Sequence, residues 1–552
     1  DIETRNKEGF TASIFASGQG HPGCLQLLIK AKADLNTADH AGSTALIVAA
    51  GMGRAKCLQL LLDAKADMHA TNKTGSTALS IAAENSETKC LQLLLDAKAN
   101  VSATDETGDA ALTFAVPGGE LACLQLLLDA KADVAAANKN GQTAFMLAAL
   151  LGKAACLKML LDAKANIHAT DISGTTVLAH AAYGGETACL QLLIDAKADI
   201  SVVDKNGDTA LIVAAREGQT ECLQLLLDAK ADIGPPNNNG DSALIIAAIK
   251  GHAGCLRLLL DAKADISAAN KGGDTALIQG ATSGHIECLQ LLLDTKAQVN
   301  AANNDGVTAL VAAANHGHSA CLQPLLGAKA DISLTDKHGY TALFAAAMVG
   351  ETASSQLLLD AKANVDAACK LGNTALIVVA GQGHTGCLQL LLDAKANVNA
   401  ANKYGDTALI MAASESHIAC LQLLLDAKAN INAARKGGET ALIGAAMNGH
   451  TGCLQMLLDA KASIDAVDKT GCPASIMVAM KGHTECLQLL LVAKADIRIA
   501  DKVGNTLPMV AAYYGQPECL KVLLDAKAGI EIRDKEGFTA LTMAAGEGHP
   551  GC

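Results

Sequence analysis

The chain has 552 residues and a formal net charge of -13; 50% of its residues are hydrophobic, but only 2% are aromatic and none is Trp. A core so poor in rings must be built from Ala and Leu, which favours closely stacked short helices over a sandwich or a barrel. The charge is spread along the chain without a basic cluster, which argues against nucleic acid as a direct partner. Apolar runs such as residues 342–349 are far shorter than the roughly 20 residues that cross a bilayer, so no membrane span is expected.

A period of 33 residues runs through the sequence. Gly9 stands two residues before Thr11, and the pair returns without an insertion as far as Gly537 and Thr539. All seventeen positions of the first column carry Gly, and the Thr column is interrupted only by Ala110, Ser242 and Pro473. We therefore expect residues 1–552 to form one continuous array of 16 periods of 33 residues plus 24 residues, without separate globular domains.

The module at residues 39–71 shows the expected elements in chain order. It begins with a turn sequence that ends in Gly42, a residue that accepts positive φ. Thr44 then occupies the N-cap position of a short helix over residues 45–50. After a Gly-rich break, the sequence CLQLLLDAKA predicts a second helix over residues 57–64, whose broad Leu stripe must be buried between neighbours.

The consensus GxTALxxAAxxGHxxCLQLLLDAKADIxA resembles the ankyrin repeat over the whole chain, in seventeen registered copies. The resemblance implies an all-α solenoid, in which antiparallel helix pairs stack side by side with projecting β-turn fingers. It also implies a curved superhelix, whose concave groove binds other proteins in this family.

Three features depart from the family pattern. The usual Pro after Thr is Ala in most copies, as at Ala45, and the usual His two residues later is replaced, as by Ile47. The loss of that His removes a hydrogen-bonding group between repeats, so we expect packing to supply more of the coupling. Lys replaces the usual Gly at the end of the second helix in all sixteen copies, from Lys32 to Lys527. We expect negative φ at most of these lysines, because the left-handed conformation costs about 1–2 kcal/mol per residue.

Sixteen of the eighteen cysteines form one column at the start of the second helix, interrupted only by Ser354. Stacked helices lie roughly 8–10 Å apart, which is too far for disulfides between column neighbours. The column is therefore interpreted as small core residues. Cys369 and Cys472 lie outside it, in turns, and are expected to be exposed. So many reduced thiols indicate an intracellular, reducing compartment, most simply the cytoplasm.

The motif HxxC occurs nine times, as at His252 and Cys255, and raises the question of metal binding. Each module offers two ligands where zinc needs about four, and the Cys belongs to the core, so no metal site is predicted. Arg54 and Gln219 replace this His in other modules, which suggests a solvent-facing position. No catalytic motif interrupts the repeats, so neither an enzyme activity nor a cofactor is predicted.

The most variable positions are the seventh and eighth after each Thr, which in the family line the concave groove. Met and Tyr occupy the seventh position in three consecutive modules near the C-terminus, a composition typical of protein contacts. Relaxed constraint at a surface position would give the same variability. The candidate groove residues are Met447, Met480, Tyr513, Tyr514, Tyr183, Arg216 and Ile249.

Three functions fit these observations. The first is a non-catalytic scaffold that binds a partner protein along the groove. The second is an architectural or elastic element of a larger array or filament, which includes end-to-end self-association. The third is a tether joined to an enzyme or a channel outside the 552 residues.

Two stretches of the sequence stand out from the regular array. Pro324 replaces a Leu of a second helix, and the next module carries Ser354 and Ser355 in place of Cys-Leu, so residues 321–356 are expected to open first. Residues 1–24 and 529–552 match at sixteen of 24 positions. That match suggests duplication of a sixteen-module block, of which this chain would be one fragment. Gene conversion between two modules would leave the same match.

Overall fold

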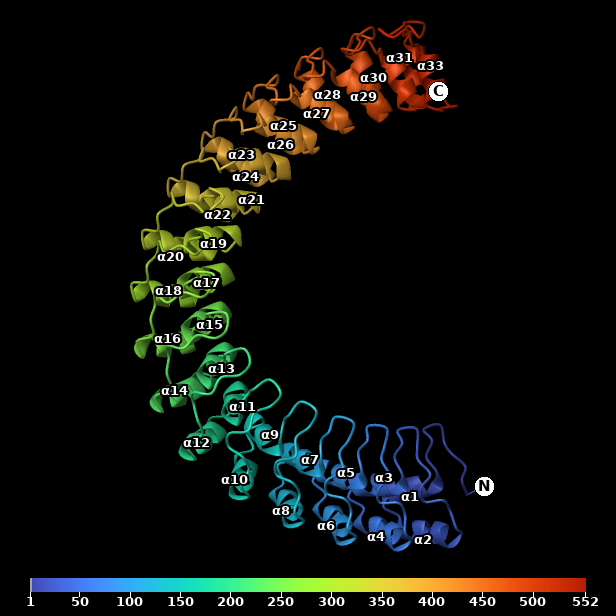
Figure 1. Cartoon of the computed structure of the whole chain (residues 1–552), viewed down its shortest axis with the longest axis vertical. Coiled ribbons are helices and arrows are strands. Elements are labelled where there is room, and N and C mark those ends of the chain that lie inside the picture. Colours follow the sequence, from blue (N-terminus) through green and yellow to red (C-terminus); the bar gives the residue numbers. More distant parts are fainter. Residues whose placement is uncertain (1) are drawn as a thin grey trace. The chain divides into compact units, whose positions relative to one another are not determined.

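The computed structural model describes residues 2–552. The chain divides into two units, Asp1–Lys271 and Gly272–Cys552. Each unit is a stack of helix pairs, and between the pairs the chain turns through a projecting loop, the finger (Figure 1). Within each unit the first helices of the pairs form one layer and the second helices form another. The expected all-α solenoid is confirmed, and the only β pairing in the described residues consists of isolated bridges at the finger bases, such as Ala38 with Thr44.

The bounds of the helices follow the repeat. The first helices are α1 (Ala12–Gln19), α3 (Ala45–Gly51), α5 (Ala78–Glu84), α7 (Ala111–Gly118), α9 (Ala144–Leu150), α11 (Val177–Gly184), α13 (Ala210–Glu217), α15 (Ala243–Lys250), α17 (Ala276–Ser283), α19 (Ala309–Asn315), α21 (Ala342–Met348), α23 (Ala375–Gln382), α25 (Ala408–Ser414), α27 (Ala441–Met447), α29 (Ala474–Lys481), α31 (Leu507–Tyr513) and α33 (Ala540–Gly546). The second helices are α2 (Pro22–Lys30), α4 (Ala55–Asp63), α6 (Thr88–Asp96), α8 (Leu121–Asp129), α10 (Ala154–Asp162), α12 (Thr187–Asp195), α14 (Thr220–Asp228), α16 (Ala253–Asp261), α18 (Ile286–Asp294), α20 (Ser319–Gly327), α22 (Thr352–Asp360), α24 (Thr385–Asp393), α26 (Ile418–Asp426), α28 (Thr451–Asp459), α30 (Thr484–Val492) and α32 (Pro517–Asp525).

Thr44 caps the first helix as its position predicts. Its Oγ1 accepts a hydrogen bond from the backbone N–H of Ile47 at 3.4 Å, which satisfies one of the free donors of the first turn. The second helix, α4, begins two residues earlier than expected and ends at Asp63. Its Cys57, Leu58 and Leu61 are fully buried, so the column of cysteines belongs to the core, as predicted.

The expectation of negative φ at the helix-end lysines is wrong. All sixteen have positive φ, between 60° and 69°. In α4 the N–H of Lys65 bonds Leu62 O at 2.9 Å and that of Ala66 bonds Leu61 O at 2.9 Å, the two bonds of a Schellman motif. These bonds satisfy helix-end carbonyls and turn Ala66 into the core, which offsets the strain of a left-handed Lys.

Cys369 and Cys472 also depart from expectation, because they are buried, with exposed fractions of 6% and 7%. Cys369 occupies the first position of its finger, where the preceding finger packs so closely that a Cβ on Gly339 would lie 3.3 Å from Cys369 Cα. The N–H of Cys472 donates to Asp468 Oδ1 at 2.8 Å, which holds that residue at the finger base. A turn in this array is therefore covered by the neighbouring turn.

Adjacent fingers are joined through their backbones. Within one finger, Asp39 Oδ1 accepts from the N–H groups of Ala41 and Ser43, both at 2.8 Å. The N–H of Lys73, in the next finger, then donates to Ala41 O at 2.8 Å. Position 42 requires Gly for two reasons. Its φ is 81°, and a Cβ there would lie 2.7 Å from Lys73 N.

The His of the HxxC motif was expected to face solvent, but His252 is only partly exposed. The Nε2 of His252 lies 3.0 Å from Arg216 O, at the end of the first helix of the preceding module. Its ring is so close to Gly218 that a Cβ there would lie 2.6 Å from Nδ1. Arg54 and Gln219 donate to equivalent carbonyls, at 3.0 and 3.3 Å. Because helix-end carbonyls lack intrahelical partners, this column supplies hydrogen bonds between modules in addition to packing.

The stretch predicted to be weak contains identifiable defects. Pro324 lies inside α20 and has no N–H to donate, although the helix continues to Gly327. Ser354 and Ser355 are fully buried in α22, and Ser354 Oγ has no hydrogen-bond partner in the described structure. A buried hydroxyl without a partner destabilises its module by about 1–3 kcal/mol.

We predict that Lys395→Gly raises the free energy of unfolding by about 1 kcal/mol, because Gly relieves a φ of 65° without disturbing either backbone bond. Denaturant unfolding measures the effect. The control is Lys403→Gly, at a position outside the positive-φ set, where added chain entropy should lower stability instead. Equal effects of the two substitutions would contradict the strain argument.

We predict that backbone amides in residues 321–356 exchange hydrogen at least about tenfold faster than those in residues 387–430, because an interior Pro and buried serines weaken two adjacent modules. Hydrogen exchange with mass spectrometry resolves the two regions. The paired substitution Ser354→Cys and Ser355→Leu restores the regular column and should slow exchange locally. Similar protection of both regions in the natural chain would refute the prediction.

Candidate functional site

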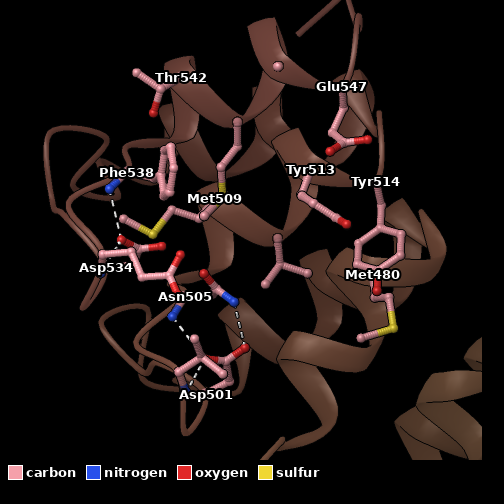
Figure 2. Close-up of a pocket in the computed structure, with 15 residues that line it drawn as sticks. Met480, Asp501, Asn505, Met509, Tyr513, Tyr514, Asp534, Phe538, Thr542 and Glu547 are labelled. Atoms are coloured by element: carbon pink, nitrogen blue, oxygen red, sulfur yellow. Dashed lines mark hydrogen bonds between the residues drawn. The ribbon is translucent and has the colours of Figure 1, made fainter.

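A cavity on the layer of first helices lies near the C-terminus, within the unit Gly272–Cys552. We call it the C-terminal groove; its volume is about 520 Å³. Helices α29, α31 and α33 and the two fingers between them supply its walls (Figure 2). The lining residues are Met480, Asp501, Val503, Asn505, Met509, Val510, Tyr513, Tyr514, Asp534, Glu536, Phe538, Thr542, Met543, Gly546 and Glu547.

Three of the residues predicted from the sequence lie together in this groove: Met480, Tyr513 and Tyr514. They come from consecutive modules, because equivalent positions of adjacent first helices stack on one face. Met447, from the module before, is not among the lining residues; its carbonyl oxygen lies 3.1 Å from His483 Nε2.

The remaining predicted residues lie in the unit Asp1–Lys271. Tyr183 is 55% exposed at the end of α11, and Ile249 is half-buried in α15. Arg216, in α13, forms an ion pair with the buried carboxylate of Asp208. Arg216 and Asp208 border a smaller cavity of about 210 Å³, whose other lining residues are Asn206, Asn237, Asn238 and Asn239.

The tyrosines form an ordered aromatic wall. The rings of Tyr513 and Tyr514 meet edge to face, with centroids 5.0 Å apart and planes at 74°, and each residue is 45% exposed. The carbonyl oxygen of Tyr513 lies 3.1 Å from His549 Nε2, so the next module fixes the backbone at this point. The two rings therefore pack on each other and remain partly exposed to solvent.

The fingers add a polar wall that the column of variable positions did not reveal. Asp501 Oδ1 accepts from the N–H groups of Val503 and Asn505, and its Oδ2 accepts from Asn505 Nδ2 at 2.9 Å. Asp534 accepts two finger N–H groups in the same way. Phe538, which precedes Thr539, could have been found from the family pattern, which places the residue before Thr in the groove.

The groove carries net negative charge. Asp501, Asp534, Glu536 and Glu547 line it, and no Lys or Arg stands among the described lining residues. None of these four carboxylates belongs to an ion pair within residues 2–552. An apolar and aromatic surface therefore lies beside uncompensated carboxylates.

Residues 2–552 contain no group of three or more His, Cys, Asp or Glu side chains placed to hold a metal ion. All eighteen cysteines are free thiols, and burial raises the pKa of most of the column, to about 11 at Cys90. A raised pKa keeps these thiols protonated and unreactive. Across the described part of the chain, no helix is long and apolar enough to cross a bilayer.

One buried His–Asp pair lies outside the groove. His180, in α11, is 7% exposed, and its Nε2 is 3.2 Å from Asp171 Oδ2 but makes no hydrogen bond. Burial lowers the pKa of His180 below its ordinary value of 6.5, and Asp171 partly opposes that shift. The pair affects the stability of the fold through its charge state.

Comparison with known proteins supports the family expectation. The family profile described as ankyrin repeats (3 copies) matches overlapping stretches that together cover the whole sequence. The matched residues are 1–72, 64–138, 119–204, 145–237, 178–270, 229–303, 267–336, 309–402, 343–435, 399–468, 428–502 and 475–552. No curated protein matches the chain.

We predict that the stability of the fold decreases as the pH falls through about 6.5, in part because of His180. The folded state lowers the pKa of this His. Its contribution to the free energy of unfolding is therefore complete above the pKa of the unfolded chain. That contribution is lost at lower pH, because the unfolded chain binds a proton more readily than the folded one. Denaturation midpoints at about pH 7.5 and pH 5 measure the loss. His180→Gln should show a smaller loss than the natural chain. An equal loss in both would contradict the assignment.

Proposed function

The chain belongs to the ankyrin repeat family, and we propose that it acts as a non-catalytic scaffold that binds a partner protein in the C-terminal groove. Ankyrin repeats are general protein-interaction modules, which supports a binding role. Met480, Tyr513 and Tyr514 are the anchor residues in this proposal.

The observation that carries the proposal is the convergence of these residues. Met and Tyr side chains from consecutive modules line one cavity of about 520 Å³, together with Met509 and Phe538. Large, partly exposed aromatic and Met side chains gathered in one hollow are the usual composition of a protein contact. Isolated exposed residues such as Tyr404 need no such explanation.

The proposal includes the surroundings in which the chain works. We assign it to an intracellular, reducing compartment, most simply the cytoplasm, because eighteen cysteines remain as free thiols. It requires no cofactor, and its partner is a protein rather than nucleic acid, in keeping with the acidic balance of the chain.

A second candidate is an architectural or elastic element, with possible end-to-end association into a larger array. It is favoured by the regular backbone bonds between fingers, such as Lys403 N to Leu371 O at 3.0 Å, which recur through both units. Such an element would need length and stiffness but no selective groove. The tether function has no specific support among these observations.

We predict that Met480→Ala with Tyr513→Ala abolishes co-purification of the partner by the tagged chain. Removing two anchors of a compact contact typically weakens binding more than about 100-fold, since each anchor contributes about 2 kcal/mol or more. Proteins bound to the natural and variant chains are compared by quantitative mass spectrometry, and circular dichroism verifies that the helices remain.

The matched control is Met68→Ala with Tyr404→Ala, which removes the same residue types from a loop and a fingertip outside the groove. It should leave the bound proteins unchanged. Equal capture by the natural chain and the groove variant would overturn the binding proposal and favour the architectural one.

A further inference from the structure

We propose that the C-terminal groove binds a partner segment bearing Lys or Arg beside apolar residues. This inference rests on the proposed function and specifies the chemistry of the partner. The cationic group would lie between the tyrosine rings and the carboxylates of the fingers, and the apolar residues would cover Met543 and Phe538.

The charge of the C-terminal groove favours a cationic partner. Four carboxylates line the groove, and no basic side chain within the described lining neutralises them. Hydrogen bonds from finger N–H groups, such as Phe538 N to Asp534 Oδ1 at 2.8 Å, hold two of these carboxylates in fixed positions. Glu536 and Glu547 are exposed at the rim. An anionic partner would be repelled, whereas a cation would gain charge-assisted hydrogen bonds.

The aromatic wall of the groove also favours a Lys or Arg side chain. Tyr513, Tyr514 and Glu547 lie on one side of the groove, and Asp501 and Asp534 lie on the other (Figure 2). Because the two tyrosine rings are at 74°, they present surfaces in different directions. A Lys or Arg group over a tyrosine face gains about 0.5–2 kcal/mol, and its aliphatic stem packs well on Met and Phe.

Within the described residues, the groove also contains a hydrogen-bond acceptor without a donor, Asn505 Oδ1. Asn505 donates through Nδ2 to Asp501, but its buried Oδ1 has no hydrogen-bond partner in the described structure. Such an acceptor destabilises the unbound protein. A segment rich in N–H groups would supply the missing donor once the finger side chains separate around it.

A second cavity, in the same unit, shows that this combination is not a general consequence of the repeat. It has a volume of about 420 Å³ and includes Asp274 and Tyr340. Asp274 accepts side-chain hydrogen bonds from Asn303 Nδ2 at 2.7 Å and from Gln279 Nε2 at 3.0 Å. Tyr340 is stacked on Phe344, with ring centroids 4.5 Å apart. This cavity also contains Asp336, which accepts two finger N–H groups as Asp534 does, so the open tyrosine pair and the exposed Glu536 and Glu547 distinguish the C-terminal groove.

The test selects peptides from a phage-displayed library of random 12-mers on the immobilised 552-residue chain. Enriched peptides are synthesised with a fluorescent label, and their affinities are measured by fluorescence anisotropy. The charge variant is Glu536→Gln with Glu547→Gln. The matched control, Glu8→Gln with Glu217→Gln, removes two charges from equivalent finger and helix-end positions of other modules. Tyr513→Ala tests the groove itself.

We expect enriched peptides to carry Lys or Arg next to apolar residues. The charge variant should weaken their binding about tenfold, the control should change it less than about twofold, and raising the salt from about 50 to 300 mM should weaken it further. Loss of binding with Tyr513→Ala but not with the charge variant would overturn the cation inference and leave the groove proposal intact. No effect of Tyr513→Ala would overturn both. Enrichment of acidic peptides, or of none, would refute the inference.

Discussion

Within each unit, neighbouring modules are held together at up to three separate points. The finger donates a backbone N–H to the preceding finger, as Lys73 does to Ala41. The residue before the second helix reaches the end of the preceding first helix, as His252 does to Arg216, and on the following loop Asn36 Oδ1 accepts from Asp67 N at 2.8 Å. These contacts fix the spacing between modules, which explains why the sixteen periods carry no insertion.

Features set by local and periodic rules could be predicted from the sequence. The period, the Thr caps and the buried Cys-Leu stripe depend on residues within one module, and they were correct. Two of the errors arose where a neighbouring module decides the outcome. Cys369 is covered by the preceding finger, and His252 is turned inward by a carbonyl of the preceding first helix. At the helix-end lysines, two backbone hydrogen bonds offset the cost of positive φ, and the expectation had considered only that cost.

The groove was predictable only in part for a related reason. A column of variable residues identifies the face on which side chains lie, and Met480, Tyr513 and Tyr514 were found in that way. It does not show where those side chains converge, so Met447 was included although it does not line the cavity. The carboxylates were missed because turn-forming Asp residues recur in most modules. Only the surroundings of Asp501 and Asp534 show that these two also face a groove.

The buried serines of α22 have a mechanical consequence. When an array of this kind is stretched, the module with the smallest unfolding barrier extends first, while its neighbours keep their helix pairs. A folded module advances the stack by about 10 Å, whereas its 33 residues can span roughly 110 Å when extended. Under force, the module that contains Ser354 and Ser355 would therefore unfold and lengthen first. The chain would extend at that position before the C-terminal groove is deformed.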